Sequence, residues 1–212
     1  MAYRIGKLRK VIWGIVVVSG LALIGAPNPS LAGEQPTEAQ ILDALKSPAR
    51  TRGFGATRSL SDPKAADQRR LIEGLRTRSA RSLSVVEREK VAEIAREKPS
   101  IDLEINFDYN SATVGPKAVP ILVALGRALS AAELKGTVFL INGHTDGKGG
   151  AEYNQDLSER RAEAVKRLLV EQFSLPATTL VAIGYGKTQF KNSADPFAGV
   201  NRRVQIVNTE VK

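Results

Sequence analysis

Apolar residues in the second half of the chain, from residue 100 onwards, switch several times between strand-like and helix-like spacing. Residues 101–106 alternate apolar with acidic or amide side chains, which predicts a half-buried strand. Short apolar runs predict three further strands, at 137–141, 180–183 and 203–207. Apolar residues at helical spacing predict two helices between the strands, at 116–129 and 154–173. The order β-α-β-α-β-β predicts an α/β two-layer sandwich, in which a mixed sheet carries both helices on one face.

The two predicted helices each have an apolar face. Pro116 is expected to open the first, whose face is formed by Val119, Leu122, Val123, Gly126 and Leu129. The face of the second is formed by Leu157, Ala164, Val165 and Leu168. Arg161 falls in the middle of this second face, and Arg160 falls at its edge. An arginine among apolar side chains is costly unless its charge is paired, so we expect Arg161 to meet Asp146 or a ligand carboxylate. The alternative is an Arg161 head group that reaches water at the end of the helix.

The first 32 residues have the three-part pattern of a secretory signal peptide. A basic start precedes the uncharged apolar run 11–25, and Pro27 and Pro29 break that run. Cleavage is expected after Ala32. The alternative is a retained membrane anchor, but a run of 15 residues is short for a span, which needs about 20.

Residues 33–99 are expected to form a basic, partly helical linker or arm. Three helix starts are recognisable: the capping boxes Thr37/Gln40 and Ser84/Glu87, and Asp62-Pro63. The first capping box predicts a helix at 38–46 and the second a helix at 85–98, with Val85, Ala92 and Ile94 packing. The segment is interpreted as a solvated spacer. The alternative is an arm that contacts an anionic membrane surface, wall polymers or another envelope protein.

The distribution of charge separates these parts. Residues 1–32 hold four basic and no acidic side chains, residues 33–99 hold 14 and 10, and residues 100–212 hold 13 and 12. The near-neutral C-terminal part argues against a nucleic-acid partner. The chain has no cysteine and one histidine, which excludes disulfides and cysteine nucleophiles and argues against a zinc site. We therefore expect no metal and no cofactor.

The loop 143–150 reads Gly-His-Thr-Asp-Gly-Lys-Gly-Gly and precedes the second predicted helix. Its glycines permit tight turns that expose backbone amides, and the helix N-terminus behind them adds a positive dipole. Together they favour an anionic group of a ligand. His144 and Asp146 do not indicate catalysis, because no nucleophile accompanies them. The segment 184–188, Gly-Tyr-Gly-Lys-Thr, is not a phosphate loop, because Val181 stands where that motif begins with glycine.

Four motifs in order resemble the OmpA C-terminal family, which includes the peptidoglycan-associated lipoprotein and the flagellar stator B subunit. They are NFDYNSA at 106–112, GHTDGKGGAEYNQDLSERRAEAV at 143–165, IGYGKTQF at 183–190 and NRRVQI at 201–206. The resemblance implies an OmpA-like domain at 100–212 that binds peptidoglycan non-covalently, at the diaminopimelate of the stem peptide. It implies no enzymatic activity, and a periplasmic location associated with the outer membrane or cell wall.

The resemblance also implies roles for particular residues. Asp146 corresponds to the residue that takes the ligand ammonium, and Arg161 to the residue that takes its carboxylate. Phe107 and Asp108 are expected to line the site, and Thr145 and Asn154 to support it by hydrogen bonds. Supporting roles near the site are expected for His144, Asn201, Arg202 and Arg203. Two further functions stay open: a periplasmic adaptor that docks another envelope protein through residues 33–99, with wall binding secondary, and, more weakly, a wall hydrolase.

Overall fold

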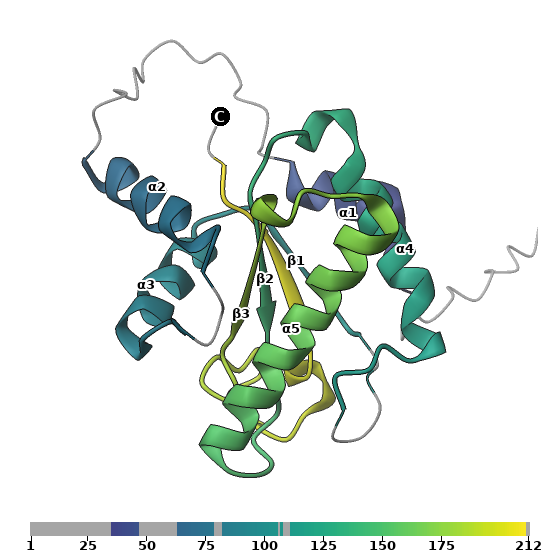
Figure 1. Ribbon diagram of the computed structural model, residues 1–212. Helices are drawn as coiled ribbons and strands as arrows, with labels where there is room; N and C mark the ends of the chain where they lie inside the picture. The colour runs from purple at the N-terminus through teal and green to yellow at the C-terminus, as the bar shows by residue number, and fades with distance from the viewer. Residues whose placement is uncertain (1–34, 47–62, 79–81, 106, 108–110, 211–212) are drawn as a thin grey trace, which may run out of the picture. The chain divides into compact units, whose positions relative to one another are not determined.

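Four strands form one mixed sheet in the computed structural model, which describes residues 35–46, 63–78, 82–105, 107 and 111–210 (Figure 1). The strands are β1 (Ser100–Leu103), β2 (Phe139–Gly143), β3 (Leu180–Gly184) and β4 (Val204–Asn208), in the spatial order β1-β4-β2-β3. β2 and β3 are parallel, and β4 is antiparallel to both of its neighbours. The predicted α/β order and mixed sheet are confirmed. The predicted leader and its cleavage point lie outside the described residues.

Three helices cover one face of the sheet: α1 (Glu38–Leu45), α4 (Val119–Ser130) and α5 (Ala151–Phe173). Their apolar side chains share a core with the alternate strand residues Phe139, Ile141, Leu180, Ala182 and Ile206. Short 3-10 helices connect the elements, among them η2 (Pro116–Ala118), η3 (Ala132–Leu134), η4 (Ala177–Thr179) and η5 (Gly199–Asn201). Both helices of the predicted domain therefore lie on the same face, as right-handed crossovers require.

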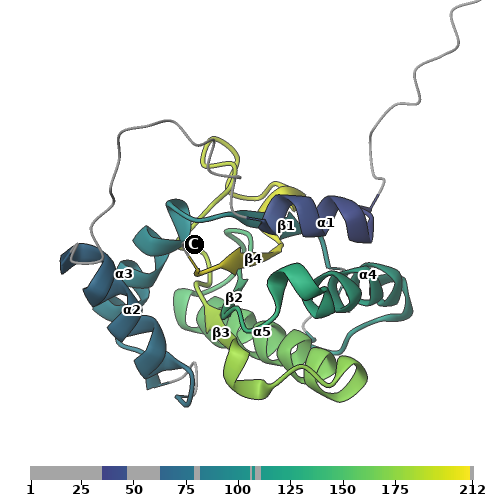
Figure 2. The same cartoon turned by 90° about the horizontal axis from the view of Figure 1, so that it is seen from above.

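The opposite face of the sheet is covered by α2 (Pro63–Leu75) and α3 (Val85–Arg96), which come from the segment expected to be a linker or arm. Figure 2 shows these two helices on one side of the strands and α1, α4 and α5 on the other. A second core joins Leu75 and Val91 of these helices to Leu140, Ile183 and Val207 of the strands. Residues 34–212 form one compact unit, so α1–α3 pack onto the sheet instead of forming a solvated spacer.

Both predicted capping boxes are present and fix where α1 and α3 begin. The expected packing of Val85 is wrong, because this side chain is 66% exposed. Val85 is the first helical residue after the Ser84 cap, and the face that meets the sheet forms later, from Val91, Ala92, Ile94 and Ala95.

The apolar faces of α4 and α5 are rotated slightly from those expected. Val119 is 47% exposed, and Ile121 and Leu125 are buried in its place. On α5, Ala164 and Leu168 are only partly buried, while Ala162 and Leu169 are fully buried. The buried positions of α5 are those that face the sheet, because α5 packs mainly on β2 and β3 and only the edge of this helix meets α4. In the described part of the chain no helix has the length and apolar character to cross a membrane.

Candidate functional site

Two glycines hold the start of α5 close to the ends of β2 and β3. Gly143 and Gly184 are partners in the parallel ladder, and α5 lies directly over them. A Cβ at Gly143 would run into the backbone oxygen of Ser158, and a Cβ at Gly184 would meet the side chains of Ser158 and Glu159. Because neither strand position tolerates a side chain, the N-terminal half of α5 and the loop 144–150 are held together at one end of the sheet.

Thr145 and Asn154, expected as supports, hold that loop by hydrogen bonds. Both are buried. Asn154 Nδ2 donates to the carbonyl oxygens of Lys148 at 2.7 Å and of Gly150 at 3.0 Å. The Thr145 amide donates to the oxygen of Gly186 at 2.9 Å, which joins the loop to the end of β3. The loop conformation is therefore set by the protein itself, before any ligand is present.

Asn201 supports the site from the C-terminal part of the chain. Its fully buried amide donates to the backbone oxygens of Asn192, Asp195 and Pro196, and its Oδ1 accepts from the Asn192 amide at 2.9 Å. Pro196 in turn accepts a hydrogen bond from the amide of Gly147 at 2.8 Å. The segment 192–202 is thereby placed beside the loop that carries Asp146.

Asp146 is nearly buried, and both of its carboxylate oxygens have partners. Oδ2 accepts from Arg202 Nη1 at 2.9 Å, and Oδ1 accepts from the Lys148 amide at 3.1 Å. The Arg202 side chain is 49% exposed, while that of Asp146 is 11% exposed. The ion-pair partner of Asp146 is thus Arg202, which we expected only as a support, and not Arg161.

Arg161 lies near Asp146, close enough for the charge of that carboxylate to act on its guanidinium. Its Nε donates to the oxygen of Ser111 at 3.0 Å, and its Cζ lies 4.8 Å from the centre of the Phe107 ring. Burial lowers the pKa of Arg161, and the charges of Tyr153 and Asp146 oppose this shift. No described residue accepts a hydrogen bond from its two Nη groups. The guanidinium is therefore stacked and oriented, and its paired N–H fork remains available to a carboxylate.

Phe107 contacts Arg161, whose guanidinium lies over its ring. Asp108 lies outside the described residues. Arg160 points to a different partner: its Nε donates to Asp156 Oδ2 at 2.7 Å, one helical turn away. The two neighbouring arginines, which fall at different places on the predicted apolar face of the helix, therefore have different partners.

His144 and Arg203 support the framework behind the site. The His144 ring is buried and stacked on Tyr185, with 5.4 Å between ring centres. Burial, with a contribution from the Arg203 charge, lowers the pKa of His144 to about 3, so the ring stays neutral at physiological pH. Arg203 is paired with Asp102 of β1 at 3.1 Å and donates to the oxygen of Gln189. A neutral, enclosed imidazole is suited to packing and not to proton transfer.

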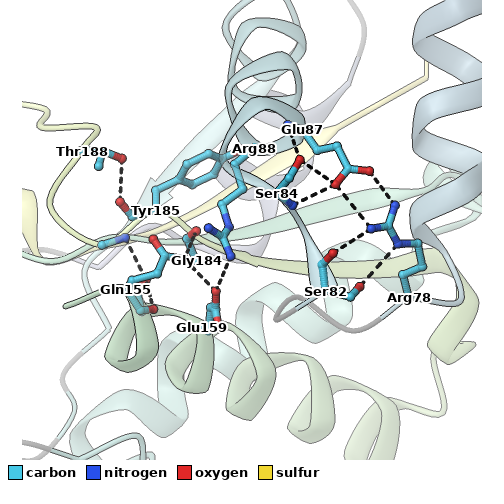
Figure 3. Close-up of polar contacts among 12 residues, drawn as sticks. Arg78, Ser82, Ser84, Glu87, Arg88, Gln155, Glu159, Gly184, Tyr185 and Thr188 are labelled. Carbon is cyan, nitrogen blue, oxygen red and sulfur yellow. Dashed lines mark hydrogen bonds and ion pairs between the residues drawn. The ribbon is translucent and has the colours of Figure 1, made fainter. Parts of the chain in front are cut away.

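One buried ion pair near the site was not predicted. Arg88 of α3 reaches Glu159 of α5 at 3.0 Å, with side chains that are 16% and 7% exposed (Figure 3). Gln155 donates to the same Glu159 oxygen at 2.7 Å and to the oxygen of Gly184 at 2.8 Å. Helical spacing alone does not identify this contact, because the partners are 71 residues apart.

An open groove adjoins the site. It has a volume of about 1130 Å³ and lies between α4, α5 and residues 111–114, so it begins at the segment whose Ser111 oxygen holds Arg161. Its walls are mixed, with Val123 and Leu168 among the apolar residues and Arg127 and Glu163 among the charged ones. Within the described ranges, no group of three or more histidine or acidic side chains is placed to hold a metal ion.

Comparison with known proteins shows which proteins this chain is similar to. Residues 106–203 match the OmpA family model. Outer membrane porin F of Pseudomonas aeruginosa is 32% identical over 125 residues, which are 58% of this chain and 34% of the porin. The peptidoglycan-associated lipoprotein of the same organism is 42% identical over 83 residues, 38% of this chain and 46% of the lipoprotein. The chain thus spans less than half the length of these two curated relatives.

Among solved structures, the cell wall anchor of the T6SS from Pseudomonas aeruginosa is 28% identical, with a TM-score of 0.43, over 52% of this chain and 81% of that one. The peptidoglycan-associated lipoprotein from Burkholderia pseudomallei is 29% identical, with a TM-score of 0.41, over 49% of this chain and 86% of that one. The family match and the sequence relatives, together with the mixed sheet and its loop, show that residues 106–203 are a domain of the OmpA family.

Proposed function

We propose that this protein anchors to peptidoglycan in the bacterial envelope by non-covalent binding of the diaminopimelate end of the stem peptide. The observation that carries the proposal is that a nearly buried carboxylate, on Asp146 of the loop, and an oriented guanidinium, on Arg161 of α5, lie close enough for their charges to interact. The names of the relatives support the ligand class, since one is a peptidoglycan-associated lipoprotein and a structural neighbour is a cell wall anchor. The porin and lipoprotein relatives also support a periplasmic location at the outer membrane or wall.

The chemistry of the ligand fits these two groups. The end of diaminopimelate is an amino-acid zwitterion, with one ammonium and one carboxylate on the same carbon. The Arg161 fork can donate two parallel hydrogen bonds to the ligand carboxylate, and Asp146 can accept from the ammonium. Burial strengthens both interactions, because screening by water is reduced. Neither interaction requires a bond to be made or broken, so the site binds without catalysis.

Arg202 affects how Asp146 can bind the ammonium of the ligand, because it is already paired with this carboxylate. In the structure this arginine occupies Asp146 Oδ2, so an incoming ammonium shares the carboxylate with it or displaces it. Displacement is feasible because half of the Arg202 side chain is exposed. The adjoining groove between α4 and α5 then offers room for the remainder of the stem peptide.

Sedimentation with purified sacculi tests the proposal, using residues 34–212. We expect Asp146→Asn and Arg161→Gln each to lower the bound fraction at least tenfold, because each removes one charge-assisted contact of about 1.5–3 kcal/mol. The matched control is Arg160→Gln, on the same helix and ion-paired with Asp156 instead. Urea titrations confirm that all variants fold. Wild-type retention by Asp146→Asn and Arg161→Gln would refute the site, and release of muropeptides by the wild type would indicate a hydrolase.

A second candidate, an adaptor for another envelope protein, is favoured by the packing of α2 and α3. The two helices share a buried core with the sheet, and their outer surface carries exposed arginines that include Arg69 and Arg70. Recovery of a defined partner with the wild type and its loss with Arg69→Glu/Arg70→Glu, while sacculus binding is unchanged, would support the adaptor function.

A further inference from the structure

A second recess lies at the opposite end of the sheet from Asp146. β2 runs from Phe139 to Gly143, and the recess adjoins Val138 before this strand, whereas the loop of Asp146 follows it. The walls come from α2, the end of α3 and the residues after β4, and the recess is open to solvent, with a volume of about 750 Å³. Its floor is apolar, made by Ile72, Ile94 and Val138, whose side chains belong to the second core. The volume lies within the range of small-molecule sites, and an apolar lining is typical of them.

Small residues keep the recess open. Gly74 in α2 and Gly136 before β2 both line it, and a Cβ built at either glycine meets no atom within 4 Å. A glycine inside a helix costs about 1 kcal/mol relative to alanine, and space does not explain its presence at position 74. Ala65, one of the smallest side chains, lines the same wall of α2. A larger residue at position 65 or 74 would reduce the free volume.

The rim of the recess carries excess positive charge. Four basic residues line it, Arg69, Arg70, Arg76 and Lys98, against two acidic ones, Glu73 and Glu210. Arg76 pairs with Glu73 at 2.8 Å, so this acid is already neutralised within the rim. Arg70 makes only a 3.8 Å contact with Asp67, between side chains that are 83% and 76% exposed. Such an exposed pair contributes little and leaves Arg70 able to turn toward an anion.

We propose that this recess binds a single-chain anionic lipid, with the tail on the apolar floor and a carboxylate or phosphate head at the arginine rim. One head and one tail match a concave apolar floor with charge confined to its edge. An extended peptide would need repeated main-chain partners, which the side-chain surfaces of two helices do not supply. The proposal is independent of the wall site, because the two sites lie at opposite ends of β2.

Titration calorimetry of residues 34–212 with dodecyl phosphate, below its micelle concentration, tests the proposal. We expect saturable binding of one molecule, with at least tenfold weaker binding of neutral dodecyl maltoside and of cationic dodecyltrimethylammonium. Gly74→Leu and, separately, Ala65→Leu are expected to abolish binding by filling the recess, while Gly74→Ala retains it. Arg69→Gln/Arg70→Gln should weaken dodecyl phosphate at least tenfold and leave dodecyl maltoside unchanged.

The outcomes separate this site from the wall site and from protein docking. Sacculus binding should be unchanged in both leucine variants, and urea midpoints should show that they fold. Wild-type affinity for dodecyl phosphate in both leucine variants would overturn the proposal, as would equal affinity for the three amphiphiles. Binding of an acidic peptide such as hexaglutamate, blocked by Gly74→Leu, without binding of dodecyl phosphate would replace the lipid with a protein partner.

Discussion

At the scale of single residues, His144 shows how burial fixes a protonation state. Its imidazole is 4% exposed and stacked on Tyr185. Neither ring nitrogen has a partner at hydrogen-bonding geometry among the described residues, although the Gln189 backbone slightly favours the protonated form. The pKa is lowered to about 3, mainly by burial. In the unfolded chain the ring returns to an ordinary pKa of about 6.5.

The free energy of unfolding should therefore fall as the pH is lowered below 6.5, because His144 then binds a proton in the unfolded state and stays neutral in the folded state. Between pH 7.5 and 5.0 this histidine accounts for a loss of about 2 kcal/mol in the free energy of unfolding. Urea titrations of the wild type and of His144→Phe, which keeps the stacked ring, measure the loss. An equally large decrease in the phenylalanine variant would show that other groups cause it.

The candidate site was partly predictable at this scale. The helical stripe that separated Arg161 from Arg160 depends on local spacing, and spacing is visible in the sequence. The partner of Asp146 was not predictable, because Arg202 follows it by 56 residues and is brought there by η5 and the network of Asn201. The second guanidinium at Asp146 is therefore a product of tertiary structure.

At the scale of elements, the contact between α3 and α5 depends on a charge pair that is removed from water. Arg88 and Glu159 lie at 3.0 Å with little exposure, and Arg88 Nε has no hydrogen-bond partner in the described part of the structure. Desolvation of such a pair offsets much of its attraction. Loss of one partner is far more damaging, because the remaining charge stays buried alone.

We expect Arg88→Met to lower the free energy of unfolding by about 3 kcal/mol, because Glu159 is left without its cation. The double variant Arg88→Met/Glu159→Gln should recover most of that loss. Chemical denaturation at pH 7.5 measures both. The exposed pair Arg160–Asp156 is the control, and Asp156→Asn should change stability by less than about 1 kcal/mol. A double variant no more stable than Arg88→Met would contradict this account.

The elements themselves were largely predictable, and their packing partners were not. The capping boxes at Thr37 and Ser84 identified the starts of α1 and α3, since a cap is a local interaction within four residues. The docking of α2 and α3 was missed because both are mostly polar, with apolar residues few enough to suggest a spacer. A narrow apolar stripe is sufficient when the opposing sheet face is itself apolar, as Leu140, Ile183 and Val207 make it here.

At the scale of the whole molecule, α2 and α3 complete the domain. Without them, the sheet face that includes Leu140, Val181 and Ile183 would be exposed to solvent. Contiguous apolar surface of this kind promotes self-association. The compact unit therefore includes α2 and α3 together with the sheet.

A fragment of residues 100–212 should consequently bind the dye ANS more strongly than residues 34–212 and sediment as oligomers at micromolar concentration. Analytical ultracentrifugation and dye fluorescence at matched concentrations measure the difference. Residues 34–212 with Arg88→Met provide the intermediate case, in which α3 is weakened but present. A monomeric, dye-free fragment would show that α2 and α3 are dispensable for solubility.

The position of β4 has a consequence for how the chain acquires its structure. This last strand pairs with both β1 and β2. Asn208, at its C-terminal end, also donates a hydrogen bond to the oxygen of Leu45 at the end of α1, 163 residues earlier. During N-to-C synthesis, α1, α2, α3 and β1 would thus emerge long before the strand that joins them to the rest. Such distant pairings slow folding, so the domain is expected to assemble only after its last residues are made. The sheet therefore stays incomplete until β4 has been made and can pair with β1 and β2.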